Sequence, residues 1–399
     1  MQISKQPIDE IMAQPVSLPK VGQLLTADEC QAIALCVAYQ GMGNVSPNPM
    51  VGAVFVDSEH KFLAAGAHLQ FGKDHAEANA LNSIKQQNRE SRLNGATVYV
   101  TLEPCAHQGN TPSCAKNLVN YPLKKVVYAQ KDPNPQVDGQ GAKILEDANI
   151  LVELDEEWGN KCNFLTAPFF HFQKSKGMYV GLKSAQSLDG SVARSGDQRA
   201  FITGKRARQY GHFLRNYYDA VVVGRNTLVL DNPKLDARNS LCHGRDPWRI
   251  VIDSSLRGIK QLGVNKANLL LSHPEKTLWV VRNELKNDSS VTQIETAGAK
   301  VVFVDFIEAE QSISLKDLHQ KLISLGIYSL LLEGGANLYT AWLNQGFVQR
   351  LHLFVAPSLM MGSNRVPFLG ANSIQIDRKI DLATVTALGD DILIEGDVV

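Results

Sequence analysis

The chain has 399 residues, in which 40 basic side chains balance 40 acidic ones. This length is enough for two domains with separate cores, and the balanced charge disfavours a nucleic-acid partner, because such binders usually carry a basic excess. Six cysteines scattered along a long chain are typical of free or metal-bound thiols in a reducing compartment. No apolar run approaches the roughly 20 residues that span a bilayer, and residues 1–25 lack the features of a signal peptide. We therefore expect a cytoplasmic globular protein without a membrane partner, in which residues 1–25 are an N-terminal extension.

The first half alternates between helical and strand patterns. A helix is expected from Thr26, because Glu29 three residues later completes the pattern of a capping box. A second helix should begin after Gly72 and carry His75 and Glu77. Such an alternation predicts a sheet with helices on its faces. The other expected elements are strands at 51–56, 62–66, 96–102, 125–129 and 150–152, and helices near 112–114 and at 142–149.

His75, Cys105 and Cys114 are candidate zinc ligands. Two thiolates and one imidazole suit zinc, and three protein ligands leave the fourth position for the water that a catalytic zinc ion ionises. Glu77 is the expected proton shuttle between this water, a ring nitrogen and the departing amine. His-x-Glu followed by Pro-Cys and a second cysteine is a signature of zinc-dependent base deaminases. The pattern favours hydrolytic deamination over a structural zinc site, or over a core histidine with ordinary buried cysteines.

The second half also alternates between strands and helices, after an expected join at 164–176. An apolar strand enters Gly334 and Gly335 and continues into a helix, and backbone N–H groups at such a turn can face a phosphate. A plain tight turn is the alternative interpretation. No G-x-G-x-x-G motif is present, which disfavours an ordinary Rossmann dinucleotide domain. The expected elements are a basic helix after 202–204, a loop at 227–235, and strands at 179–185, 220–224, 249–254, 278–281, 301–304, 330–332, 351–357 and 391–395.

Three motifs of the first half resemble a known family. SPNPMVG (46–52), TLEPCAHQGNTPSC (101–114) and KDPNPQVDGQG (131–141) resemble the deaminase domain of the bifunctional riboflavin-biosynthesis deaminase–reductases, a cytidine-deaminase-like α/β/α domain. The eight residues between the two cysteines separate this family from tRNA adenosine and nucleoside cytidine deaminases. The resemblance implies a substrate, 2,5-diamino-6-(phosphoribosylamino)pyrimidin-4-one. The residues that it implies for substrate binding are Asn48, His107, Asp132 and Asn134.

One position between the cysteines departs from that family. After the glycine of this loop the family usually carries Lys or Arg, whereas this chain has Asn110. A cation there would suit the substrate phosphate. The substitution therefore bears on how the deaminase holds that phosphate.

Motifs of the second half recur in the order seen in the reductase domain of the same family: LKSAQSLDG, SGDQRAFITG, TLVLDNPKLDAR, RIVIDS, LLLEGGANL and VAPSLMMG. That α/β domain resembles dihydrofolate reductase and uses NADPH to convert the ribosyl group into ribityl. The resemblance implies Lys183, Asp231 and Glu333 near the centre of hydride transfer. The implied substrate contacts are Arg215, Leu235, Arg238 and Glu333, and the implied cofactor contacts are Ala185, Phe201, Thr227, Asp231, Ser254, Gly334, Gly335, Ala336 and Asn337.

The two resemblances together predict two enzymes in one chain, which catalyse consecutive reactions. We expect a zinc-dependent deaminase domain at 26–173 and an NADPH-dependent reductase domain at 174–399, with a homodimer built on the reductase. One alternative is a zinc deaminase of another nucleotide or of a tRNA base, fused to a reductase-like nucleotide-binding module. Others are a protein with only one active head, or a structural zinc site beside a nucleotide-sensing module.

Overall fold

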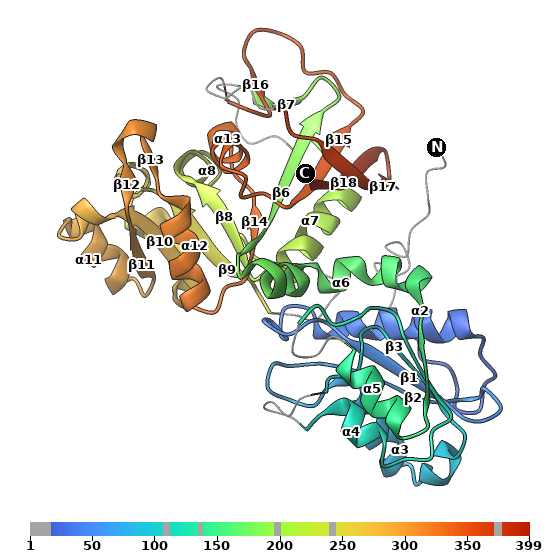
Figure 1. The fold of residues 1–399 in the computed structure, drawn as a ribbon. Coiled ribbons are helices and arrows are strands. Elements are labelled where there is room, and N and C mark those ends of the chain that lie inside the picture. Colours follow the sequence, from blue (N-terminus) through green and yellow to red (C-terminus); the bar gives the residue numbers. More distant parts are fainter. Residues whose placement is uncertain (1–16, 107–111, 135–138, 195–200, 239–244, 371–376) are drawn as a thin grey trace. The chain divides into compact units, whose positions relative to one another are not determined.

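The computed structural model describes residues 17–106, 112–134, 139–194, 201–238, 245–370 and 377–399. These residues fold into two compact units, each with its own sheet and helices (Figure 1). The N-terminal unit ends at Lys176, and the C-terminal unit begins at Gly177. No described helix is long and apolar enough to cross a membrane.

The N-terminal unit is built on a five-stranded sheet with the order β2-β1-β3-β4-β5. The first two strands form the expected hairpin, β1 is also antiparallel to β3, and the remaining pairs are parallel. The strands are β1 (Gly52–Val56), β2 (Phe62–Ala67), β3 (Thr97–Val100), β4 (Lys125–Tyr128) and β5 (Leu151–Leu154).

Helices cover both faces of this sheet, because alternate strand residues point to opposite sides. Phe55 and Val98 pack with residues of α3, α4 and α5, whereas Val54 and Tyr99 pack with α2. Thr26 and Glu29 form the expected capping box at the start of α2. The helices are α2 (Ala27–Ala38), η1 (Tyr39–Gly41), α3 (Ala76–Gln86), η2 (Glu90–Leu93), α4 (Cys114–Leu118), α5 (Gln140–Asp147) and α6 (Glu156–Ser175).

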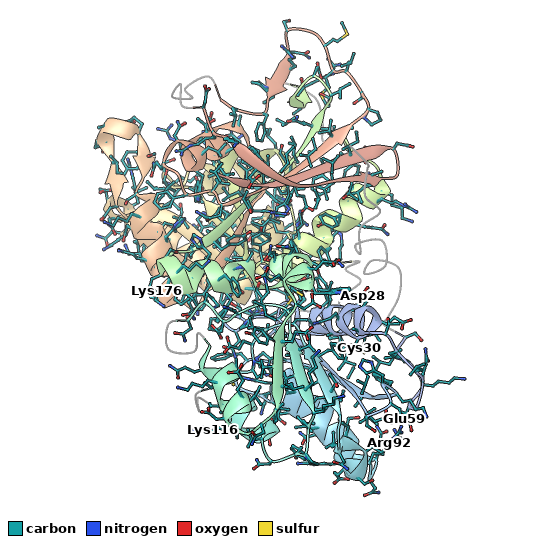
Figure 2. All side chains as sticks on the ribbon, turned by 45° about the vertical axis from the view of Figure 1, so that its right-hand side comes forward. Asp28, Cys30, Glu59, Arg92, Lys116 and Lys176 are labelled. Atoms are coloured by element: carbon teal, nitrogen blue, oxygen red, sulfur yellow. The ribbon has the colours of Figure 1, made fainter. Side chains whose placement is uncertain are left out.

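The expected join at 164–176 is helical: these residues form the last turns of helix α6 and its cap, and the boundary between the two units follows directly at Lys176 and Gly177. Asp155 begins the helix by accepting a hydrogen bond from the backbone N–H of Trp158. Pro168 lies inside the helix, where it removes one backbone hydrogen bond without ending the element. The Trp158 indole donates to the Asp28 carboxylate at 2.9 Å, which ties α6 to α2. Asp28 is labelled on the side-chain view of Figure 2.

The C-terminal unit contains a nine-stranded sheet with the order β11-β10-β9-β8-β14-β6-β15-β18-β17. The run from β11 to β15 is parallel, and the last two strands are antiparallel. β17 was not expected from the sequence. The strands are β6 (Tyr179–Ser187), β8 (Ala220–Gly224), β9 (Trp248–Ile252), β10 (Thr277–Arg282), β11 (Lys300–Val304), β14 (Ser329–Leu332), β15 (Arg350–Ala356), β17 (Ile380–Leu388) and β18 (Asp391–Val398). Two small sheets pair β7 (Ser191–Arg194) with β16 (Arg365–Pro367), and β12 (Phe306–Ile307) with β13 (Ser312–Ile313).

Helices lie against both faces of this sheet. Val180 and Leu182 pack with α12 and α13 on one face. On the other face Gly181 makes room for Tyr218, the C-cap residue of α7, since a Cβ atom there would lie 2.0 Å from the Tyr218 hydroxyl oxygen. The helices are α7 (Lys205–Tyr217), α8 (Arg225–Asp231), α9 (Arg257–Leu262), η3 (Val264–Lys266), α10 (Asn268–Leu271), η4 (Pro274–Lys276), η5 (Asn283–Leu285), α11 (Ser289–Thr296), η6 (Glu308–Glu310), α12 (Leu315–Ser324) and α13 (Ala336–Asn344).

The loop expected at 227–235 is only partly a loop. Residues 225–231 form α8, which begins after Gly224 and ends at Asn232, whose backbone is left-handed with φ of 38°. Pro233 then prevents any continuation of the helix. The segment from Gly224 to Pro233 contains neither glycine nor proline in its interior, so nothing in it opposes a helical turn.

Candidate functional site

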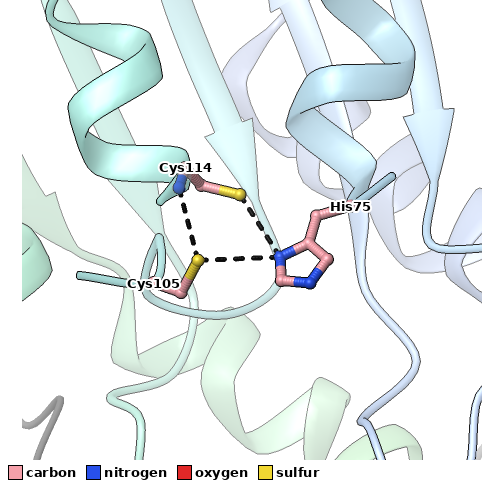
Figure 3. Close-up of side chains that lie close together, drawn as sticks. All are labelled: His75, Cys105 and Cys114. Atoms are coloured by element: carbon pink, nitrogen blue, oxygen red, sulfur yellow. Dashed lines mark hydrogen bonds between the residues drawn. The ribbon is translucent and has the colours of Figure 1, made fainter. Parts of the chain in front are cut away.

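The three predicted zinc ligands converge in the N-terminal unit. His75 is the N-cap residue of α3, Cys105 follows β3, and Cys114 begins α4. The ligand atoms lie within 4.8 Å of one another (Figure 3). His75 Nδ1 is 3.6 Å from Cys105 Sγ and 3.4 Å from Cys114 Sγ.

These distances fit one zinc ion. A tetrahedral zinc ion with Zn–S bonds of about 2.3 Å and Zn–N bonds of about 2.0 Å separates its sulfur and nitrogen ligands by roughly 3.5 Å. The backbone N–H of Cys114 points at Cys105 Sγ at 3.3 Å. A hydrogen bond from Cys114 and the nearby His75 lower the pKa of Cys105 to about 4, despite burial. Cys105 is therefore a ready thiolate ligand.

Glu77 lies beside the cysteines, as the sequence predicts. It is in the first turn of α3, only 3% exposed, with Oε2 3.3 Å from Cys114 Sγ. Burial, and then the Cys105 thiolate, raise the pKa of this carboxyl group. A carboxyl group with a raised pKa exchanges a proton more readily near neutral pH.

Asn48 is linked to the zinc-ligand cluster through His68, a residue that the sequence did not single out. His68, 2% exposed, interacts through Nδ1 with the Asp74 carbonyl at 3.0 Å and through Nε2 with Asn48 Nδ2 at 3.2 Å. Its ring lies edge-on to that of His75, with centroids 5.0 Å apart. The sequence spacing around His68 does not identify it as a site residue, because its partners come from a turn (Asn48) and from the residue before the N-cap of α3 (Asp74).

Asp132 and Asn134 belong to the segment after β4. Asp132 is 7% exposed and accepts from the backbone N–H of Asn134 at 2.9 Å. The buried carboxylate of Glu103 accepts from the N–H groups of Asp132, Gly139 and Gly141 at 3.4, 3.2 and 3.1 Å, and so fixes both ends of this segment. Glu103 was also missed, although its place directly before Pro-Cys was a usable signal. His107 and Asn110 lie outside the described residues.

In the C-terminal unit, every residue predicted for the reductase lines one cavity of about 1810 Å³. The cavity lies where parallel strands end, the usual place for ligands in open α/β sheets. The predicted residues that line it are Lys183, Ala185, Phe201, Arg215, Thr227, Asp231, Leu235, Arg238, Ser254, Glu333, Gly334, Gly335, Ala336 and Asn337.

Glu333 holds two cations in this cavity. Arg215 donates to both carboxylate oxygens, from Nε at 2.6 Å and from Nη2 at 2.9 Å, and Lys183 Nζ lies 3.6 Å from Oε2. Burial opposes the ionised form, but the charges of Arg215 and Lys183 outweigh it and lower the pKa of Glu333 to about 2. Glu333 is therefore a fixed anion that orients two cations.

The Gly334-Gly335 turn leads into α13, whose N-terminus has no side-chain cap. A Cβ atom on Gly335 would meet nothing within 4 Å, whereas one on Gly334 would lie 2.2 Å from a Leu338 methyl carbon. Gly335 thus leaves open space at the cavity wall, and Gly334 permits close packing. Backbone N–H groups that no side chain caps can bind a phosphate where space is open beside them, so the turn fits a phosphate group.

A second cavity of about 200 Å³ adjoins the first and shares Arg215, Leu235 and Arg238 with it. Lys234, which the sequence did not single out, also lines it. Leu235 has a left-handed backbone with φ of 55°, which a leucine rarely adopts and which is typical of functional sites. Three cations around a small cavity suit an anionic group.

Two known families match the chain in consecutive stretches. The family described as "Cytidine and deoxycytidylate deaminase zinc-binding region" matches residues 26–130. The family described as "RibD C-terminal domain" matches residues 178–394, more than half of the chain. The first match spans the zinc ligands, and the second spans the cavity of the C-terminal unit.

Several relatives match this chain over about nine tenths of its length, so that the match includes both units. The chain is 36% identical to the riboflavin biosynthesis protein RibD of Actinobacillus pleuropneumoniae, over 91% of this chain and 93% of that protein. It is 34% identical to RibD of Aquifex aeolicus, over 91% and 96%. Among solved structures, Acinetobacter baumannii RibD matches with a TM-score of 0.75 at 32% identity, over 93% of this chain and 98% of that one. A Thermotoga maritima structure named as a diaminohydroxyphosphoribosylaminopyrimidine deaminase/5-amino-6-(5-phosphoribosylamino)uracil reductase matches with a TM-score of 0.75 at 28% identity, over 93% and 98%.

Proposed function

The chain belongs to the RibD family of bifunctional riboflavin-biosynthesis enzymes, with a zinc-binding deaminase region and a reductase domain, and from this premise we propose its substrate, its cofactor and the role of each site residue. The substrate is 2,5-diamino-6-(phosphoribosylamino)pyrimidin-4-one. The first head replaces an amino group of the pyrimidine by oxygen and releases ammonia. The second head reduces the ribosyl group of the product to ribityl with NADPH.

In the deaminase head, His75, Cys105 and Cys114 hold the zinc ion. When bound, the ion supplies an ionised water at neutral pH, which is the nucleophile for the amino-bearing carbon. Glu77 accepts the proton of the attacking water, protonates the ring nitrogen and then passes a proton to the leaving amine, so that water and the aminopyrimidine give the oxo product and ammonia. The burial of Glu77, which raises its pKa, supports this role.

Asn48 orients the pyrimidine, and His68 orients Asn48. The Asp74 carbonyl can only accept, so His68 Nδ1 carries the hydrogen. Burial lowers the pKa of His68 and favours the neutral ring, in which Nε2 is an acceptor. Asn48 therefore donates to His68 through Nδ2, which leaves its Oδ1 to accept from an N–H group of the pyrimidine. Asp132 and Asn134 complete the substrate site, and His107 is proposed to contact the substrate from the loop between the cysteines.

The reductase head holds the dinucleotide at the carboxyl ends of the parallel strands. The backbone N–H groups of the Gly334-Gly335 turn and of the start of α13 bind its pyrophosphate. When bound, NADPH supplies the hydride for C1′ of the sugar. The further cofactor contacts are Ala185, Phe201, Thr227, Asp231, Ser254, Ala336 and Asn337.

Lys183 acts on the sugar, and Glu333 positions Lys183. The bond between C1′ and the ring oxygen breaks as the exocyclic nitrogen forms a C=N bond, and the ring oxygen takes a proton from the Lys183 ammonium group. Hydride addition to C1′ then gives the ribityl chain. Glu333 keeps Lys183 and Arg215 in place as a fixed anion. Asp231 lies at the same cavity wall and is proposed near the hydride-transfer centre.

The smaller cavity is the proposed site of the substrate phosphate. Lys234 and Arg238 line it, and Arg215 borders both cavities. Arginine and lysine side chains bind phosphate oxygens through charge-assisted hydrogen bonds. The left-handed backbone of Leu235 turns the chain so that these cations flank the cavity.

We also propose that residues 26–173 and 174–399 act as the deaminase and reductase domains after an N-terminal extension, and that the enzyme is a homodimer formed through the reductase. The thiol ligands of the proposed zinc site support a reducing compartment, the cytoplasm.

The observation that carries the proposed function is the zinc triad with Glu77 in the same chain as a cavity that gathers fourteen predicted reductase residues. The test is incubation with the diaminopyrimidinone phosphate, with and without NADPH, in which ammonia and NADPH absorbance are followed separately. We expect ammonia in both reactions, and NADPH oxidation in the reaction that contains NADPH but not in a control without the diaminopyrimidinone phosphate. Release of ammonia from cytidine or tRNA, with none from this substrate, would contradict the proposal.

A further inference from the structure

Helix α7 presents a stripe of polar side chains to the large cavity of the C-terminal unit. Lys205, Arg208, His212 and Arg215 follow one another at spacings of three, four and three residues, which places them on one helix face. All four line the cavity. The three cations can only donate hydrogen bonds, whereas a histidine can also accept one. His212 is not among the residues that the family resemblance implies for either ligand.

The partner of His212 determines which ring nitrogen carries the hydrogen. Nδ1 lies 3.1 Å from the carbonyl oxygen of Asp236, and because a carbonyl only accepts, Nδ1 must be the donor. The same carbonyl accepts from Arg215 Nη1 at 3.0 Å. Burial, and then the charge of Arg215, lower the pKa of His212, which favours the neutral ring. In that form Nε2 carries a lone pair and is an acceptor.

The surroundings of His212 belong to the proposed substrate site. Asp236 lies between Leu235 and Arg238, which line both cavities. Gly211 beside it faces the Lys183 side chain, since a Cβ atom there would lie 3.7 Å from Lys183 Cε. His212 is therefore flanked by the residues proposed to protonate the sugar and to hold the phosphate.

A sugar phosphate needs two kinds of partner. Its phosphate oxygens accept hydrogen bonds, and its hydroxyl groups must find acceptors when they leave water. The cations of this region supply only donors, and the Glu333 carboxylate already holds Arg215 and Lys183. The neutral Nε2 of His212 meets the need for an acceptor.

We propose that His212 Nε2 accepts a hydrogen bond from a hydroxyl group of the substrate ribose and so holds the sugar for hydride transfer. The inference rests on the proposed function, because it places the phosphoribosylated pyrimidine in this cavity. His212 binds and orients the sugar and transfers no proton. It also makes the site selective, because a sugar without that hydroxyl leaves a desolvated nitrogen unpaired.

Two substitutions separate the roles of the two ring nitrogens. The amide nitrogen of His212→Asn can take the place of Nδ1 and still donate to the Asp236 carbonyl, but nothing remains at Nε2. The longer His212→Gln places its amide near the position of Nε2 and restores an acceptor there. His273→Asn, at an exposed histidine outside both cavities, is the control.

The assay uses the full-length enzyme, NADPH and 5-amino-6-(5-phosphoribosylamino)uracil. We expect His212→Asn to raise the KM of this substrate about tenfold, the effect of losing one hydrogen bond in a desolvated site, with an unchanged KM for NADPH. His212→Gln should recover most of the loss, and His273→Asn should match the wild type. Wild-type enzyme that fails to oxidise NADPH would overturn the proposed function itself. Active wild type with unaltered kinetics in His212→Asn would overturn only the role of His212.

Deoxy substrates distinguish a contact from a structural effect. With analogues that lack the 2′- or the 3′-hydroxyl, the tenfold penalty of His212→Asn should disappear for one analogue and persist for the other. An equal penalty with both analogues and the parent substrate would contradict the proposed contact. A thermal unfolding midpoint equal to that of the wild type is expected for His212→Asn.

Discussion

The zinc centre and the reductase cavity differ in how the chain builds them. The zinc ligands and Glu77 come from 40 consecutive residues, His75 to Cys114, and they form a small, partly buried cluster. The reductase cavity of about 1810 Å³ gathers residues from Lys183 to Val366, and its central ion-pair cluster joins β6, α7 and the end of β14. In the proposed function, the compact centre acts through a few atoms that take part in the reaction, whereas the wide cavity uses cations and backbone groups to position two ligands.

Glu77→Gln tests the compact centre with the largest expected effect. The amide keeps the size of the side chain but cannot carry protons, so ammonia release should fall by about 10³-fold. The zinc content, measured by metal analysis, should stay at the wild-type value because the three ligands are intact. NADPH oxidation with the deaminated substrate is the control, and a fall there would show that the two heads are not independent.

Glu333→Gln tests the wide cavity. It leaves Arg215 and Lys183 without their anion, and we expect the kcat/KM of reduction to fall by about 10²-fold, while ammonia release is unchanged. The loss of a buried ion-pair partner should also lower the free energy of unfolding of the C-terminal unit by about 3 kcal/mol. Unchanged reductase kinetics would contradict the positioning role of Glu333.

The pH dependence of stability checks the same ion pair. The folded-state pKa of Glu333 is depressed from 4.5 to about 2. A depressed carboxyl pKa stabilises the fold above the unfolded-state pKa, and this contribution is lost as the pH falls from about 4.5 to about 2. Urea unfolding of wild type should therefore lose stability across this window, and Glu333→Gln should lose less. Equal losses in both proteins would show that the ion pair does not stabilise the unit.

Gly335→Ala and Gly334→Ala form a matched pair at the glycine turn. The first adds a methyl group to open space at the cavity wall, so the KM for NADPH should rise about tenfold while the unfolding midpoint stays constant. The second places a Cβ atom 2.2 Å from a Leu338 methyl carbon, so it should lower the unfolding midpoint. If Gly335→Ala lowered the unfolding midpoint and Gly334→Ala raised the KM for NADPH instead, phosphate binding at Gly335 would be excluded.

Asn110→Lys has the smallest expected effect. It restores the cation that the family usually carries between the cysteines, and a charge-assisted contact with the substrate phosphate should lower the KM of deamination about threefold. The reductase kinetics should not change. A KM of deamination that stays the same or rises would show that this enzyme holds the phosphate through other residues.

The difference between the two regions also explains what could be predicted from the sequence. The zinc ligands could be predicted because their types and spacing lie within one local motif. His68 and His212 could not, because each is defined by partners from other elements, namely Asn48 and Asp236. Glu103 was missed although it stands directly before Pro-Cys; its partners lie in the segment after β4.

The fold was predictable where patterns are strong. The parallel core strands are continuous apolar runs, and the capping box marks the start of α2. Helix α8 was missed because its seven residues, about two turns, carry no cap signal. Helix α6 was missed because Pro168 suggested a join. Strand β17 is a half-exposed edge strand with a register shift between Leu382 and Thr384, so its apolar alternation is weak.

The most direct test of consecutive action by two separate heads uses Glu77→Gln with the diaminopyrimidinone phosphate and NADPH. Neither ammonia release nor NADPH oxidation should be seen at first. Addition of 5-amino-6-(5-phosphoribosylamino)uracil should then start NADPH oxidation at the wild-type rate. Oxidation of NADPH before that addition, or ammonia release at the wild-type rate, would contradict the account.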